Sequence, residues 1–201
     1  GTENLLESAT NTHVQRFVFS SSAAVYGNQN TKCHEQLPLS PTSIYAETKV
    51  AGEKLCALFR KKYGLETIVL RYFNVYSEKQ TIQKGYGAVI PLFKEKLLQK
   101  QPITIFGNGL QTRDFITVDE VARANMLAGC IPYPAEPIIN VASGISKTML
   151  ELLNELIEQL KCEKPIVNFA PERPGDVAQS EANCDRYLAL KKIFEGNNAA
   201  S

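Results

Sequence analysis

The order of hydrophobic and polar positions along the chain predicts alternating strands and helices. Nearly continuous apolar runs at 14–20 and 66–72 predict buried strands, and the spacing of apolar residues over 41–63 predicts a helix that Gly64 ends. A further helix is expected at 2–10. Apolar strands separated by helices are typical of a parallel sheet covered on both faces. We therefore expect an α/β fold whose first part is the end of a doubly wound parallel sheet.

The pattern changes after residue 75, where the predicted strands become shorter. We expect a smaller α/β lobe here, interwoven with the first sheet. The sequence GNG at 107–109 lies between two short strands and predicts a hairpin turn. The expected elements are helices at 88–99, 118–129, 148–160 (with Ser146 as a candidate cap) and 183–194, and strands at 102–106, near 113–118, at 138–142 and at 165–169.

Composition and charge then narrow the classes of partner. The net charge is +1 over 201 residues, and no basic block suggests a nucleic-acid partner. The apolar runs have the length of strands, so no membrane span is expected, and the first residues lack the order of a signal peptide. The five cysteines are widely spaced with no CxxC pair, which predicts reduced thiols in a cytoplasmic protein rather than a metal site or disulfides.

Candidate chemistry gathers where the first strand ends. Ser20, Ser21 and Ser22 follow an apolar run, and ligands of open parallel sheets bind at the carboxyl ends of the strands. Tyr45 and Lys49 lie four residues apart in the next helix, so they share one helix face. A phenol ionises with a pKa of about 10, and an adjacent ammonium group favours its phenolate form. Such a pair can act as a general base toward a hydroxyl.

The combination of these motifs is more specific than any one of them. SSSAAVYG, YAETK, LRYFNVY, RDFITVDEVARA and ERPGDVAQS occur in that order along the chain. In this order and spacing the sequence resembles the extended short-chain dehydrogenases/reductases of the NAD-dependent epimerase/dehydratase family, and most closely its nucleotide-sugar 4-epimerases. The resemblance implies a partial Rossmann-like NAD-binding domain at 1–75 with the catalytic residues. It implies a lobe at 76–201 that mainly binds a nucleotide sugar.

The resemblance also implies a reaction. NAD takes a hydride from C4 of a UDP-hexose or UDP-N-acetylhexosamine and returns it to the other face of a transient 4-keto sugar. Tyr45 matches the base, Lys49 the residue that assists it and holds the nicotinamide ribose, and Ser22 the hydroxyl that shares the proton. The implied cofactor-binding residues are Ser20, Ser21, Tyr45, Lys49 and Phe73.

A substrate site in the second lobe is implied as well. Two arginines match a clamp on the diphosphate, because the guanidinium fork fits phosphate oxygens. In the family, the position that Ser180 matches limits the room for the C2 substituent of the sugar, and serine is small, so the resemblance implies space for an N-acetyl group here. The implied substrate residues are Ser22 and Asn74, Ala88, Val89 and Ile90 near the uracil, Arg113 and Arg173 on the diphosphate, Asp176 on the ribose, and Ser180; no metal is implied.

Two alternatives stay open, and one further expectation concerns assembly. The family's phosphate-binding GxxGxxG turn is not in this sequence, so we expect the chain to be part of a longer enzyme, or a non-catalytic UDP-sugar-binding fragment. Another activity of the family, dehydration or reduction of a nucleotide sugar, is the second alternative, although Ala23 and Ala24 stand where dehydratases carry a carboxylate. Relatives also pair through a four-helix bundle, which implies a homodimer through the helix near 41–63.

Overall fold

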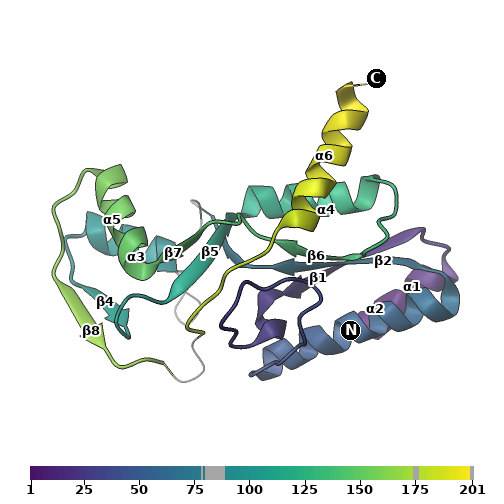
Figure 1. The fold of residues 1–201 in the computed structure, drawn as a ribbon, viewed down its shortest axis with the longest axis horizontal. Coiled ribbons are helices and arrows are strands. Elements are labelled where there is room, and N and C mark those ends of the chain that lie inside the picture. The colour runs from purple at the N-terminus through teal and green to yellow at the C-terminus, as the bar shows by residue number, and fades with distance from the viewer. Residues whose placement is uncertain (78, 80–88, 174–176, 200–201) are drawn as a thin grey trace.

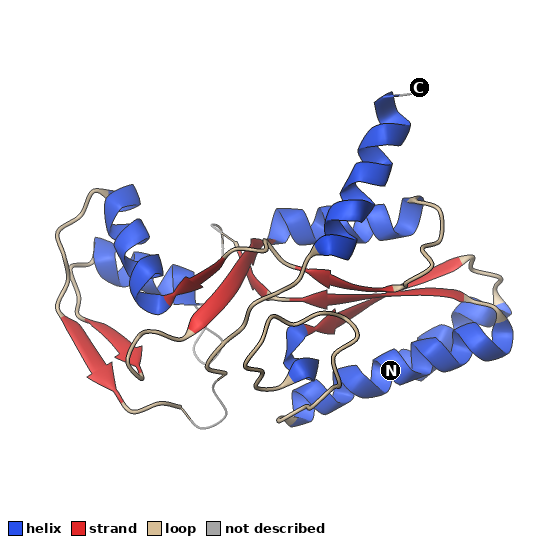
Figure 2. Ribbon diagram, in the orientation of Figure 1, coloured by secondary structure: helices blue, strands red, loops and turns tan. Residues whose placement is uncertain are grey.

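The computed structural model describes residues 1–77, 79, 89–173 and 177–199 and shows two lobes side by side (Figure 1). The first lobe contains a parallel sheet of β1 (Arg16–Ser22), β2 (Glu66–Tyr72) and β6 (Ile138–Val141), in that order. Helices α1 (Thr2–Asn11) and α2 (Ile44–Tyr63) lie on one face, and α4 (Val118–Cys130) and α6 (Asp185–Ala199) on the other (Figure 2). The predicted parallel sheet with two helical layers is confirmed.

The alternation of side chains along β2 explains why both faces need a helical layer. Ile68 and Leu70 are fully buried and pack in one cluster with Leu127 of α4. Val69 points the other way and belongs to a second cluster with Phe59 of α2. A strand that buries both of its faces is nearly continuous in hydrophobicity, as the sequence of β2 is.

The second lobe is built on two small sheets. In the first, β5 (Thr112–Thr117) pairs in parallel with β3 (Asn74–Tyr76) and antiparallel with β7 (Ser146–Thr148). In the second, β4 (Ile103–Phe106) pairs in parallel with β8 (Val167–Ala170). Helices α3 (Val89–Leu98) and α5 (Met149–Leu160) bury their apolar faces against these strands.

The hairpin predicted at 107–109 is wrong. β4 pairs with β8, more than sixty residues later, and does not pair with β5. Gly107 and Gly109 have φ values of +73° and +79°, which glycine adopts readily. The two glycines therefore allow the chain to turn between strands that belong to different sheets. The turn chemistry was therefore visible in the sequence, but the strand pairing was not.

Other differences concern the ends of elements. α2 begins at Ile44, because Ser43 is its N-cap and accepts a hydrogen bond from the Ala46 amide. The cap of α5 is Thr148 rather than Ser146, and it forms a capping box with Glu151. None of the helices in the described part of the chain combines the length and apolar content needed to cross a bilayer.

Candidate active site

The serines at the end of β1 point to different partners. Ser20 is exposed, and its Oγ lies 2.9 Å from Oη of Tyr72. Ser21 is buried, and its hydroxyl donates a hydrogen bond of 2.5 Å to Oε1 of Glu53. Ser21 was expected to line a cofactor pocket, whereas its hydroxyl lies in the protein interior.

Ser22 takes a third direction because the strand ends there. Its Oγ accepts a hydrogen bond of 3.2 Å from the Ala24 amide and so caps the short 3-10 helix η1 (Ala23–Tyr26). An acceptor role in the cap leaves the hydroxyl hydrogen of Ser22 to donate elsewhere. The side chain is half-buried and lines a cavity, described below.

Tyr45 and Lys49 lie on the first turns of α2, beside the end of β1. Nζ of Lys49 donates a hydrogen bond of 2.9 Å to the Ser20 carbonyl and lies 5.5 Å from the centroid of the Tyr45 ring. The Tyr45 side chain is 55% exposed. The Ser20 carbonyl is a neutral acceptor, so the ammonium charge of Lys49 remains next to the phenol.

The smaller of two neighbouring cavities lies at the ends of β1 and β2. It has a volume of about 240 Å³. Ser22 lines it from β1, Phe73 and Asn74 follow β2, and Ser180 closes it from the C-terminal part of the chain. With Arg113 of β5, five of the predicted site residues, from distant parts of the sequence, are thus brought to one cavity.

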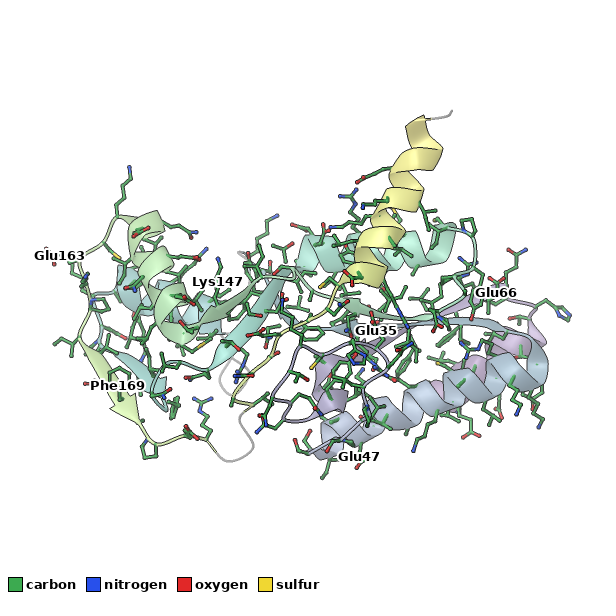
Figure 3. The ribbon with its side chains drawn as sticks, in the orientation of Figure 1. Glu35, Glu47, Glu66, Lys147, Glu163 and Phe169 are labelled. Carbon is green, nitrogen blue, oxygen red and sulfur yellow. The ribbon has the colours of Figure 1, made fainter. Side chains whose placement is uncertain are left out.

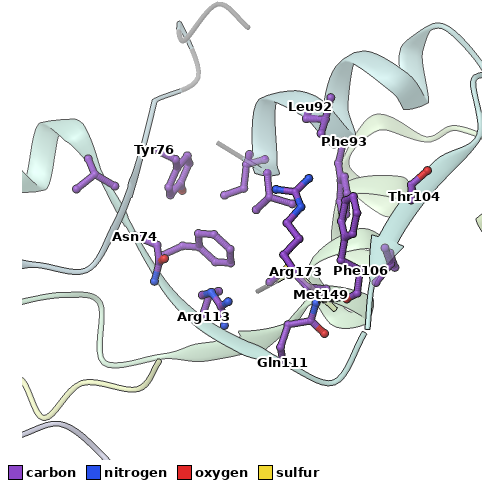
Figure 4. Close-up of a pocket in the computed structure, with 15 residues that line it drawn as sticks. Asn74, Tyr76, Leu92, Phe93, Thr104, Phe106, Gln111, Arg113, Met149 and Arg173 are labelled. Atoms are coloured by element: carbon purple, nitrogen blue, oxygen red, sulfur yellow. Dashed lines mark hydrogen bonds between the residues drawn. The ribbon is translucent and has the colours of Figure 1, made fainter. Parts of the chain in front are cut away.

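The larger cavity lies within the second lobe, between β3, β4, β5 and α3 (Figure 4). It has a volume of about 360 Å³. Five predicted substrate residues line it: Asn74, Val89, Ile90, Arg113 and Arg173. Asn74 and Arg113 also line the smaller cavity, so the two cavities adjoin at these side chains.

Aromatic and polar side chains complete the larger cavity. The guanidinium carbon of Arg173 lies 3.8 Å from the ring centroid of Phe106, so the cation is stacked on an aromatic face. Sequence reasoning missed Phe106 because it looked like an ordinary apolar residue of a short strand. It also missed Tyr76, Gln111 and Met149, which carry no motif.

Asn74 and Ser180 are held in fixed positions. Nδ2 of Asn74 donates to the Asp114 carbonyl (2.9 Å) and to Oγ of Ser180 (3.3 Å). The backbone of Ser180 pairs with that of Thr112 and Asp114 in β5. The Asp114 carboxylate is fully buried and accepts hydrogen bonds from Ser143 and the Gly144 amide.

The buried Asp114 carboxylate connects the two lobes through its hydrogen bonds. Burial raises the pKa of its carboxyl above the ordinary value, although the donors at Ser143 and Gly144 oppose this shift. These donors follow β6 of the first lobe, whereas Asp114 belongs to β5 of the second.

Two further predicted residues, Ala88 and Asp176, lie outside the described residues.

The site can be compared with known proteins. A model of the NAD-dependent epimerase/dehydratase family matches residues 1–142, more than half of the chain. The chain belongs to this family. NAD is the family's cofactor, and the Rossmann-type fold of its members agrees with the parallel sheet described above.

Solved structures and relatives of the family are similar over most of the chain. A UDP-N-acetylglucosamine 4-epimerase from Methanobrevibacter ruminantium, in complex with UDP-N-acetylmuramic acid, has a TM-score of 0.88 at 36% identity over 94% of this chain and 60% of that chain. A UDP-glucose 4-epimerase of Thermus thermophilus in complex with NAD has a TM-score of 0.83 at 33% identity, covering 94% and 62%. A dTDP-glucose 4,6-dehydratase of Streptomyces niveus is 30% identical over 87% of this chain and 51% of its own length. The chain therefore spans about half to three fifths of the length of these relatives.

The residues at the end of β1 fit the nicotinamide end of NAD. The ammonium group of Lys49 has hydrogen-bond donors beyond the one given to the Ser20 carbonyl, the hydroxyl of Ser20 offers an acceptor because its hydrogen goes to Tyr72, and Tyr45 offers an exposed ring and hydroxyl. Phe73 is buried but lines the smaller cavity from the next strand. This edge of the family's sheet thus carries polar groups suited to a ribose and a carboxamide.

Proposed function

We propose that this chain carries the catalytic residues and the substrate lobe of an NAD-dependent nucleotide-sugar 4-epimerase. The observation that supports the proposal best is the pair of cavities that adjoin at Asn74 and Arg113. A UDP-sugar has the matching order of parts: a nucleoside, a diphosphate and a sugar. The larger cavity would take the nucleoside, the shared wall the diphosphate, and the smaller cavity the sugar.

The charges along this path agree with that placement. Arg113 stands at the junction, and Arg173 stands in the larger cavity, so both guanidinium groups can reach a diphosphate. Val89 and Ile90 offer apolar contacts to the uracil ring. Ala88 and Asp176 remain part of this proposal for the base and the ribose.

The reaction would take place above Ser22. Bound NAD supplies the chemistry of accepting a hydride from C4 and returning it. Tyr45 would remove the proton of the 4-hydroxyl, assisted by the positive charge of Lys49. Ser22 would donate its hydroxyl hydrogen to the same sugar oxygen and hold the ring in place. In the reverse half-reaction Tyr45 returns the proton to the new 4-hydroxyl.

Ser180 supports a substrate range that includes N-acetylated sugars. Its small side chain lines the sugar cavity, and its backbone pairing with β5 fixes it there. A side chain of two heavy atoms leaves space beside the sugar that an aromatic residue would fill. We infer that UDP-N-acetylhexosamines are accepted as well as, or in place of, plain UDP-hexoses.

A dehydratase is the second candidate, because a dTDP-glucose 4,6-dehydratase is among the relatives. Ala23 and Ala24 line the smaller cavity beside Ser22 and carry no acid or base for the loss of water.

A homodimer through α1 and α2 is also part of the proposal. Both helices expose leucines to solvent, namely Leu5 (61%) and Leu58 (52%).

The test is an epimerase assay on the natural protein over its complete length, with UDP-glucose and UDP-N-acetylglucosamine as substrates. The Tyr45→Phe variant is expected to lower kcat at least 100-fold, because general-base catalysis contributes about 10² to 10⁴, and to bind UDP as the wild type does. Tyr63→Phe, at the far end of the same helix, is the matched control. Turnover by Tyr45→Phe at the wild-type rate would contradict the mechanism, and UDP binding without any turnover by the wild type would favour a binding protein.

A further inference from the structure

A buried ion pair lies directly behind the candidate catalytic residues. Glu53 is the third member of a stripe on α2, four residues after Lys49 and eight after Tyr45, so the three lie on one face of the helix. The Glu53 carboxylate is 6% exposed and the Arg71 side chain 2%. Nη2 and Nε of Arg71 donate to the two carboxylate oxygens at 2.6 and 3.0 Å, which is a bidentate pair.

The pair connects the elements that carry the site. Oε1 of Glu53 also accepts the hydroxyl of Ser21, the residue between Ser20 and Ser22. Ser20 in turn holds Lys49 through its carbonyl. The position of α2 along β1 is therefore set at two successive residues of the strand, once by Lys49 and once by Glu53.

The other side of Arg71 holds the chain that follows Ser22. Nη1 of Arg71 donates to Oη of Tyr26 (2.9 Å) and to the Glu35 carbonyl (3.1 Å). Tyr26 is fully buried and belongs to η1, the turn that Ser22 caps. Figure 3 labels Glu35 beside the sheet of the first lobe and Glu47 on the outer part of α2. The guanidinium of Arg71 thus joins α2 to the turn on which Ser22 lies.

Stability alone is a weak reason for such a pair. Burial of a guanidinium and a carboxylate costs much of what their attraction returns, and apolar residues of similar volume are often as stabilising. Burial favours the neutral form of Arg71, yet the hydrogen bonds to Glu53 keep its pKa above the ordinary value, so the buried guanidinium stays charged. What the pair provides beyond packing is a fixed geometry between three elements.

We propose that the Glu53–Arg71 pair is a positioning device that fixes α2 against the end of β1, and thereby the distance of Tyr45 and Lys49 from the sugar above Ser22. This inference rests on the proposed epimerase function. Neither residue touches the substrate or the cofactor in this account. Both act through the placement of Tyr45, Lys49 and Ser22.

The test compares kinetics of variants in the natural full-length protein. Glu53→Gln alone would leave the guanidinium of Arg71 buried without a counter-charge, so the test uses two variants that avoid an unpaired charge. The double variant Glu53→Gln/Arg71→Met removes both charges at similar volume, and Glu53→Asp keeps the charge on a shorter side chain. Glu47→Gln, the same change on the exposed side of α2, is the matched control.

For the double variant and for Glu53→Asp we expect UDP affinity within about twofold of wild type and kcat lowered about 10- to 100-fold, because a displacement of about 1 Å can cost 10²-fold. The pH profile of kcat is expected to change with it, and Glu47→Gln to change neither. Folded variants with wild-type kcat per NAD-loaded site and an unchanged pH profile would overturn the proposal.

A second readout separates this inference from the proposed function. If the wild-type protein epimerises no UDP-sugar, the proposed function fails, and ultraviolet titration of Tyr45, measured as the difference from Tyr45→Phe, still reports its distance from Lys49. The pair positions the two side chains if the titration midpoint differs between the wild type and Glu53→Asp, which keeps both charges of the pair. An identical midpoint in both overturns the positioning role.

Discussion

The contact between α2 and β1 gives the sharpest stability prediction. Gly52 of α2 faces the ring of Phe19, and a Cβ at this position would meet the Cζ atom of the ring and lie 2.9 Å from both Cε atoms. Carbon atoms attract one another best at about 3.5 to 4.0 Å, so the added methyl overlaps the ring. Phe19 is itself nearly buried and cannot move aside without disturbing its cluster. The change Gly52→Ala is therefore a small-to-large change in a packed core.

Two effects of opposite sign set the magnitude. Alanine is better than glycine in a helix interior by about 1 kcal/mol, whereas overpacking a core costs about 1 to 3 kcal/mol. The ring is rigid, and the added Cβ would overlap three of its atoms. We therefore expect an overpacking cost in the upper part of that range, and a net loss of stability of about 1 to 2 kcal/mol. In a protein of this size 1 kcal/mol shifts Tm by about 2 to 4 °C.

The assay is thermal unfolding of Gly52→Ala beside Gly129→Ala. Gly129 is also helical, in α4, but an added Cβ there has no neighbour within 4 Å. The control is therefore expected to raise the stability by about 0.5 to 1 kcal/mol through helix propensity alone. Equal increases of Tm in both variants would refute the tight contact between Gly52 and Phe19.

Three further predictions concern charge and substrate range. Burial tends to raise the pKa of Glu120, but hydrogen bonds from Lys191 and Tyr187 outweigh this effect and hold the pKa below the ordinary value. The stability lost in Glu120→Gln should therefore be greatest near neutral pH and shrink as the pH falls below about 4.3, the ordinary carboxyl pKa. A difference in urea unfolding that does not depend on pH would contradict this. Arg173→Met should weaken UDP binding about 10- to 100-fold in calorimetry, since a hydrogen bond to a charged group contributes about 1.5 to 3 kcal/mol, whereas the surface change Arg123→Met should not; equal affinities would remove Arg173 from the site. Ser180→Tyr should abolish turnover of UDP-N-acetylglucosamine and spare UDP-glucose in a coupled assay, and equal losses on both sugars would contradict the role of Ser180.

Much of the fold was predictable because its signals are local. The apolar runs of β1 and β2 and the helical spacing of α2 identified the first lobe, and Gly64 ends α2 in the left-handed conformation that glycine favours. The pairing of β4 with β8 was not predictable, since it depends on how two distant segments meet rather than on either sequence.

The candidate site shows the same division. Ser22, Asn74, Arg113 and Ser180 were predicted from motifs, and the structure brings them to one cavity. The partners of the three serines were not predictable, because Ser21 is hydrogen-bonded to a carboxylate 32 residues away. A run of identical residues in a strand alternates between faces, so a shared motif does not give a shared role.

The central claim is that the sugar is oxidised at C4 and that the same hydrogen returns to the opposite face of C4. The most direct measurement follows a UDP-sugar with deuterium at C4 through turnover by the natural full-length protein, with the product analysed by NMR. The account predicts a product inverted at C4 that keeps the label there. A label lost to solvent, or moved to C6 with loss of water, would contradict it.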